Sequence, residues 1–377
     1  MSTDDAPSAT RRPPAPDHDP LPEAPPEAVP DDGGEEAAAG PVTAAVRGDG
    51  DVWGGSEFDV PGVVDSRIPN IARVYDYWGG GKDNFAADRR LADLVRASVP
   101  GIVDHVAANR EFLVRVVREL AKDGVDQFLD LGAGIPTSPN VHEVAHAVNP
   151  ATRIVYVDND PVVLASARAL LAVNRTVTVV SADLREPGSV FQHPEVTGHL
   201  DWTRPVAVLA VAVLHFLTDA QATALLQATA RALHGSLPGG AGHLASAGGG
   251  GGGVVVISHV APLDLQAPRE PGTAQGVDQA AVDGMSEAVA LYNAKAGPFL
   301  PRTAAHLADL IAGWEYLPPG LVPVTQWRPS DQRGPTTASA GRASSRDPAV
   351  RTAGSPGPVP VLGVVARPPR HLDGPAG

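Results

Sequence analysis

The stretch Phe128-Leu-Asp-Leu-Gly-Ala-Gly134 joins an apolar run to a glycine turn, and it decides the fold. The apolar run 125–131 predicts a buried strand. Glycines at 132 and 134 let the backbone approach a ligand closely and leave the amides of the next helix free for polar atoms. Because ligands of open parallel sheets bind beyond the carboxyl ends of the strands, this turn marks a candidate binding site.

Strand and helix patterns alternate along the rest of the chain. Asp160 is a suitable N-cap for one of these helices, with Pro161 in its first position. Alternation of this kind predicts an α/β fold whose mostly parallel sheet has helices on both faces. No helix is expected between the last two strands, so they should form an antiparallel hairpin and bring the sheet to seven strands. The expected strands are 125–131, 153–157, 176–181, one within 205–212, 254–258, 321–327 and 359–366, and the expected helices are 102–122, 141–148, 161–173, 219–233, 281–294 and 303–312.

Acidic residues end the second and third of these strands. Asp158 follows Val157, where a carboxylate can accept hydrogen bonds from both hydroxyls of a ribose. Asp183 stands where a carboxylate can accept a hydrogen bond from an exocyclic amine. Each signal alone is weak, because a strand-terminal Asp is more often an N-cap, and Gly-x-Gly recurs by chance in a chain with 40 glycines. In this order, about 25 residues apart, they indicate a nucleoside site.

These motifs resemble those of class I S-adenosylmethionine-dependent methyltransferases. Asp130-Leu-Gly-Ala-Gly134 looks like their first motif, Asp158 their ribose position, and Ala182-Asp183-Leu184 their adenine position. The segments 66–89, which contains Tyr-Asp-Tyr-Trp-Gly-Gly-Gly-Lys-Asp-Asn, and 109–113 are similar to a bacterial, mainly actinobacterial, family known only as S-adenosyl methyltransferases. The resemblance covers roughly residues 63–366, apart from two insertions.

The resemblance implies a Rossmann-like methyltransferase sheet that binds S-adenosylmethionine. One departure is that Thr137 stands at the third glycine position of the Gly-x-Gly-x-x-Gly turn, so the turn must differ beyond Gly134. The same departure disfavours a dinucleotide oxidoreductase. The residues expected to bind the cofactor are Asp130, Gly132, Ala133, Gly134, Asp158, Asn159, Ala182, Asp183, Leu184, Ala210, Tyr77 and Gly80.

The expected reaction is methyl transfer to a small-molecule acceptor, which the sequence does not identify. A dedicated base is not required when the acceptor is already nucleophilic, so the sequence assigns no firm catalytic residue. The candidates are His215, Tyr75 and Tyr77, and a packed histidine is the more frequent role for His215. Two alternatives are a regulatory protein that binds S-adenosylmethionine without catalysis and, less favoured, a nicotinamide-dependent oxidoreductase.

Composition divides the chain into an acidic tail and a nearly neutral remainder. Residues 1–60 contain ten prolines, 14 acidic and 3 basic side chains, so they carry −11 of the total charge of −14. We expect residues 1–62 to be a disordered tail, 63–124 a helical cap, and 125–366 the methyltransferase domain. The Gly-rich stretch 238–253 and the Ser-rich stretch 330–358 are expected to be flexible insertions, and 367–377 a disordered C-terminus. We expect the segment 75–84 of the cap to close on the cofactor as a lid.

Charge and composition also exclude several classes of function. A near-neutral fold offers no basic groove, so we expect no nucleic-acid partner. No Cys is present, which excludes a disulfide framework and a thiolate metal site, and we expect no metal. No apolar run is long enough to cross a bilayer of about 30 Å, so we expect a cytoplasmic protein without a membrane partner. The sequence does not specify an oligomeric state.

Overall fold

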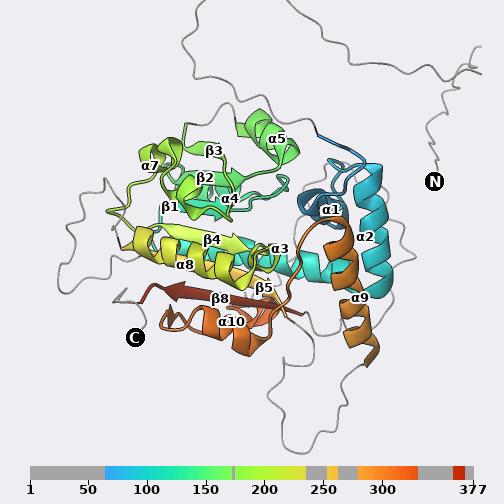
Figure 1. Cartoon of the computed structure of the whole chain (residues 1–377). Helices are drawn as coiled ribbons and strands as arrows, with labels where there is room; N and C mark the ends of the chain where they lie inside the picture. The colour runs from blue at the N-terminus through green and yellow to red at the C-terminus, as the bar shows by residue number, and fades with distance from the viewer. Residues whose placement is uncertain (1–63, 172–174, 235–252, 262–278, 330–359, 370–377) are drawn as a thin grey trace, which may run out of the picture. The chain divides into compact units, whose positions relative to one another are not determined.

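The protein is built around one mixed sheet of eight strands in a computed structural model that describes residues 64–171, 175–234, 253–261, 279–329 and 360–369 (Figure 1). The strand order is β3-β2-β1-β4-β5-β8-β6, with β7 also paired to β8. The first five strands are parallel to one another, and β8 runs antiparallel to β5, β6 and β7. The strands are β1 Gln127–Leu131, β2 Arg153–Asp158, β3 Val177–Ser181, β4 Ala207–Val211, β5 Val254–Val260, β6 Glu315–Tyr316, β7 Val322–Pro323 and β8 Val361–Arg367.

Helices connect these strands and precede the first of them. The helices are α1 Ile71–Trp78, α2 Ala86–Ser98, α3 Ile102–Lys122, α4 Val141–His146, α5 Pro161–Leu171, α6 Pro187–Phe191, α7 Pro194–His199, α8 Asp219–Leu233, α9 Gln279–Lys295 and α10 Ala304–Leu310, with short 3-10 turns η1 Leu214–Phe216 and η3 Val324–Gln326. Asp160 caps α5 as predicted, because its Oδ1 accepts from the amides of Val162 (2.7 Å) and Val163 (3.2 Å).

Two apolar layers cover the two faces of the sheet. On one face, alternate strand residues such as Leu129 and Val157 pack with helices α6, α7, α8 and α10. On the other face, their neighbours Phe128 and Ile154 pack with α3 and α4. The central strands β1, β2, β4 and β5 are therefore buried on both sides, as their apolar sequences predict. The helix α3, which the sequence groups with the cap, packs its buried stripe on the sheet.

A third cluster joins α1, α2 and α9. Trp78, Leu91 and Val95 of α1 and α2 pack with Met285 and Tyr292 of α9, and these helices lie side by side in Figure 1. The sequence places the helix 281–294 in the segment expected to help build the acceptor pocket, with covering the sheet as its default role. In the structure, α9 packs on the cap helix α2. Gly284 permits this contact, because a Cβ there would lie 2.0 Å from the Ser98 carbonyl oxygen at the end of α2.

The C-terminal part of the sheet differs in detail from the prediction. The expected strand 321–327 is shortened to β7, because Val324–Gln326 forms a 3-10 turn, and β6 is an additional short strand. The sheet therefore has eight strands rather than seven. Arg367, predicted to begin the C-terminal tail, pairs with Glu315 as the last residue of β8.

Several predictions lie outside the described residues. They are the tail 1–62, the insertion 238–253 except Gly253, the insertion 330–358, and residues 370–377. Within the described part of the chain, no helix is long and apolar enough to span a membrane.

Candidate functional site

The glycine turn after β1 is held against the end of β2. Gly132 and Gly134 both have positive φ angles, +68° and +66°. The amides of Gly132 and Ala133 donate to the Val157 carbonyl at 2.8 and 3.0 Å. The Gly134 amide donates to the Asp158 carboxylate at 2.9 Å. Asp158 thus fixes the turn as well as ending its strand.

Asp158 accepts three backbone hydrogen bonds. Its Oδ1 accepts from Asn159 (2.8 Å) and Asp160 (2.9 Å), while Oδ2 accepts only from Gly134. Burial raises the pKa of Asp158, although these three amides oppose the shift. Since a carboxylate oxygen can accept two hydrogen bonds, Oδ2 retains capacity for one hydroxyl of a ligand.

Asp130, in β1, is a buried carboxylate that accepts no hydrogen bond from the described residues, and only 6% of it is exposed. Burial raises its pKa to about 7; the positive charge of Arg110 opposes that shift and Asp158 adds to it. An ionised carboxylate in this position requires a cation, which a ligand with an ammonium group would supply.

Asp183 lies after β3 in a more exposed position. Arg185 forms a bidentate ion pair with it, with contacts down to 2.5 Å, and this pair lowers the pKa of Asp183. Because Arg185 is exposed, the pair adds little stability, and a ligand amine can compete for the carboxylate.

One cavity of about 330 Å³ brings most of the predicted cofactor residues together. Its lining also includes Tyr75 of α1 and Asn109 of α3, while Ala210, Tyr77 and Gly80 are not part of it. Ala210 is buried within β4, and the Tyr77 hydroxyl is directed to Asp93 at 3.4 Å. The predicted residues that line the cavity are Asp130, Gly132, Ala133, Gly134, Asp158, Asn159, Ala182, Asp183 and Leu184.

His215 is packed among aromatic rings and lies outside the lining of this cavity. It is 3% exposed, and its ring centroid lies 4.4 Å from that of Phe216 and 5.2 Å from that of Phe299. Burial lowers its pKa to about 3, and Arg302 adds to this shift. The packing role therefore describes His215 better than a role as a base.

We predict that His215→Phe reduces the loss of stability in acid. The folded protein keeps this histidine neutral down to pH about 3, whereas in the unfolded chain it is protonated below about pH 6.5. Its contribution is therefore fully present above pH 6.5 and is lost as pH falls, with a slope of up to about 1.4 kcal/mol per pH unit. Urea unfolding of the wild type and the variant from pH 7.5 to 4.5 measures the difference. Free energies of unfolding that fall by the same amount in both proteins over this range would refute the prediction.

Beyond Gly134, the loop that contains Thr137 is held by a residue of α3. Arg110, on α3, donates through Nη2 to the carbonyls of Thr137 (2.7 Å) and Pro139 (3.0 Å). This clamp takes the place of a third glycine in shaping the loop. It ties α3 to the same loop whose Gly134 lines the cavity.

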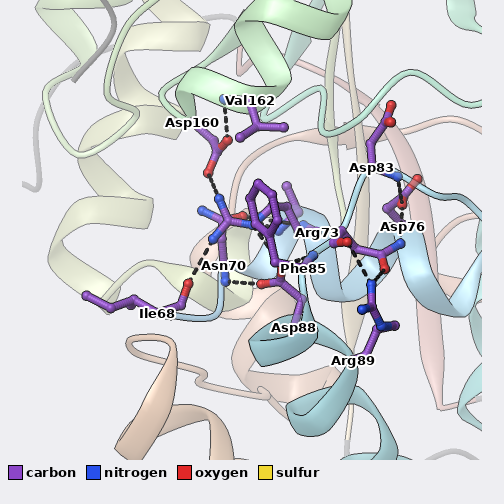
Figure 2. Close-up of polar contacts among 12 residues, drawn as sticks. Ile68, Asn70, Arg73, Asp76, Asp83, Phe85, Asp88, Arg89, Asp160 and Val162 are labelled. Carbon is purple, nitrogen blue, oxygen red and sulfur yellow. Dashed lines mark hydrogen bonds and ion pairs between the residues drawn. The ribbon is translucent and has the colours of Figure 1, made fainter. Parts of the chain in front are cut away.

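The cap is joined to the β2–α5 loop by the buried side chain of Arg73 (Figure 2). Arg73 Nε donates to Asp88 at 3.0 Å, Nη1 to Asp160 at 3.2 Å, and Nη2 to the Ile68 carbonyl at 2.8 Å. The Phe85 ring covers the guanidinium at 5.1 Å. One residue thus connects α1, the start of α2 and the cap of α5, next to Asp158.

Gly81, the last residue of the glycine run 79–81, lies against the carboxylate of Asp76. Asp76 Oδ2 accepts from the Asp83 amide (3.1 Å) and from Asn84 Nδ2 (2.8 Å). A Cβ on Gly81 would lie 1.8 Å from Asp76 Oδ1, so only glycine fits there. Asp76 lines the cavity, whereas Lys82 is exposed.

Sequence reasoning did not assign Arg73, Asp76, Asn109 or Tyr292 to the site. The first three stand inside the segments that carry the family resemblance, which was a usable signal, but no spacing rule gives them partners as distant as Asp160 or Ser258. Tyr292 lies in the segment 260–319, which the sequence predicts to build the acceptor pocket together with the cap, but no polar pattern there distinguishes this residue.

The strand order, the glycine turn and the acidic strand ends together define a class I methyltransferase fold. The S-adenosyl methyltransferase family model matches residues 59–249, and the chain belongs to this family. A structure from Thermobifida fusca, named provisionally as a methyltransferase, is 33% identical with a TM-score of 0.62, covering 80% of this chain and 96% of its own. A DUF574 family protein from Streptomyces avermitilis is also 33% identical with a TM-score of 0.62, covering 81% and 99%. No curated protein matches the chain.

Proposed function

We propose that this protein transfers a methyl group from S-adenosylmethionine to a small-molecule acceptor. The observation that carries the proposal is that Asp130, Asp158 and Asp183, which end three neighbouring strands, line one cavity. The volume of about 330 Å³ lies within the range of small-molecule sites.

The residues of the cavity fit the parts of the cofactor. Asp183 would accept a hydrogen bond from the adenine amine. Asp158 Oδ2 would accept a hydrogen bond from one ribose hydroxyl, and Asn159 lies beside it. The Asp130 carboxylate would bind the ammonium of the methionine moiety. A Cβ on Gly134 would meet no atom within 4 Å, so this glycine leaves open space where the cofactor can lie against the backbone.

When bound, the cofactor would supply an electrophilic methyl group to a lone pair of the acceptor, whose proton would pass to solvent. The protein contributes alignment and exclusion of water. Tyr75 of α1 and Asn109 of α3 line the cavity, and Asn109 accepts a hydrogen bond from Ser258 of β5.

Calorimetric titration with S-adenosylhomocysteine and with NAD tests the proposal. We expect the first to bind and the second not to bind. Binding of NAD alone would indicate the oxidoreductase alternative. Tight binding of S-adenosylhomocysteine with no labelled methyl transferred to any acceptor in a metabolite extract would indicate the regulatory alternative.

We predict that Asp130→Asn weakens S-adenosylhomocysteine binding by about ten- to a hundredfold, since a hydrogen bond to a charged group is lost. In the wild type, affinity should rise as pH increases to about 7 and then level, because Asp130 must lose its proton to bind a cation. The variant should lack this rise. Asp309→Asn, on the exposed face of α10, is the control. Equal affinities and pH profiles for wild type and variant would contradict the role of Asp130.

A further inference from the structure

The cavity has two chemically different ends. The carboxylates of Asp183, Asp158 and Asp130 follow the strand order from β3 to β1. Beyond β4 the lining becomes aromatic, with Phe216 of η1 and Tyr292 of α9. If the nucleoside lies at the acidic end, the aromatic end is left for the acceptor.

A chain of hydrogen bonds from the sheet orients Tyr75 at the aromatic end. The Ala212 amide donates to Ser258 Oγ at 2.9 Å, and Ser258 Oγ donates to Asn109 Oδ1 at 2.6 Å. Asn109 Nδ2 donates to the Tyr75 hydroxyl at 3.0 Å. The Tyr75 oxygen is therefore an acceptor in this chain, and its own proton remains available to a ligand.

The second hydroxyl at this end belongs to Tyr292. The residue is 4% exposed, and the rings of Trp78, Phe216 and Phe299 hold it at centroid distances of 6.4, 6.2 and 4.8 Å. Its hydroxyl has no hydrogen-bond partner among the described residues. Burial raises the pKa of Tyr292, and the nearby Tyr75 adds to the shift, so both phenols stay protonated at neutral pH.

We propose that the Tyr75 and Tyr292 hydroxyls form the acceptor subsite and bind the phenolic oxygen of an aromatic small molecule, an inference that rests on the proposed function. Two hydroxyl donors stabilise a phenolate over the neutral phenol. A phenolate oxygen has three lone pairs, so it can accept both hydrogen bonds and still attack the methyl carbon with the third. An aromatic amine has one lone pair, which a single donor would occupy.

The step balances without a further reactant. The phenol loses its proton to solvent before transfer, and the phenolate lone pair becomes the new oxygen–carbon bond. The electron pair of the broken carbon–sulfur bond stays on sulfur, whose positive charge is neutralised. Asn109 acts through Tyr75 and is a positioning residue.

The probe 4-nitrophenol, whose ionised form has a distinct absorbance, tests this subsite in protein saturated with S-adenosylhomocysteine. We expect the probe to bind as the phenolate, with its pKa lowered by about one unit on binding. Tyr75→Phe and Tyr292→Phe should each weaken phenolate binding about tenfold, the effect of losing one charged hydrogen bond. The matched amine, 4-nitroaniline, should bind more weakly than the phenolate and should lose less affinity in either variant.

Two measurements separate failure of this inference from failure of the proposed function. The affinity for S-adenosylhomocysteine should be unchanged in both variants, which also shows that they fold. Tyr316→Phe, in β6 outside the cavity lining, should behave as wild type. The inference is overturned if S-adenosylhomocysteine binds but 4-nitrophenol does not, if the substitutions leave phenolate binding intact, or if the amine binds better. Absence of S-adenosylhomocysteine binding would overturn both.

Discussion

Replacing Arg73 by Met should lower the free energy of unfolding by about 3–5 kcal/mol, the usual cost of removing one partner from a buried ion pair. The side chains of Arg73 and Asp88 are 4% and 0% exposed, and Asp160 is 5% exposed. Methionine keeps most of the apolar volume but leaves both carboxylates buried without their cation. Urea unfolding monitored by tryptophan fluorescence measures the change.

The same substitution should weaken S-adenosylhomocysteine binding, because it removes the link between the cap and the loop of Asp158. Arg67→Met is the matched control: Arg67 pairs with Asp65 on the surface, with 87% of its side chain exposed, so no measurable change is expected. Adding Asp88→Asn to Arg73→Met should recover part of the lost stability by removing one stranded charge. A loss below about 1 kcal/mol in Arg73→Met would show that the network is not a structural link.

The parts of the fold that were predictable are those with local periodicity. The helix 102–122 and the helix 219–233 have the bounds that their apolar stripes and caps predict. The strands β1, β2, β4 and β5 are buried almost throughout, so their continuous apolar runs identify them, whereas the edge strand β3 is only partly buried. The strand 321–327 was predicted too long, because its apolar residues outweighed Pro323, which disfavours a continuing strand and directly precedes the 3-10 turn at Val324 that packs against α3.

The residues of the candidate site were predictable only where the order of the strands along the chain determines their position in the fold. Residues at the carboxyl ends of the parallel strands β1, β2 and β3, or just beyond them, must meet at one edge, so Asp130, Asp158 and Asp183 could be grouped from their spacing alone. The contacts of Arg73 with Asp160 and of Asn109 with Ser258 cross 87 and 149 residues of sequence, and they follow from how the cap packs. A single sequence contains no signal for such distances.

Gly132→Ala should lower the free energy of unfolding by about 2–5 kcal/mol, because two penalties act together. The φ angle of +68° costs a residue with a Cβ about 1–2 kcal/mol. The new methyl group would lie 2.6 Å from Val213 Cγ2, and relieving such an overlap in a packed site costs about 1–3 kcal/mol. Val213 is β-branched and 9% exposed, so it cannot rotate away freely.

Gly134→Ala is the matched control, since its φ of +66° is almost the same but a Cβ there meets nothing within 4 Å. The free energy of unfolding of Gly134→Ala should fall only by the cost of the positive φ angle, about 1–2 kcal/mol. Its methyl group would instead enter the space assigned to the cofactor, so S-adenosylhomocysteine affinity should fall at least as much as in Gly132→Ala. Chemical denaturation should therefore show the larger loss of stability in Gly132→Ala, whereas calorimetry should show the larger loss of S-adenosylhomocysteine affinity in Gly134→Ala. Equal losses of stability would show that the contact of Gly132 with Val213 does not constrain the turn, and unchanged affinity in Gly134→Ala would place the cofactor away from this loop.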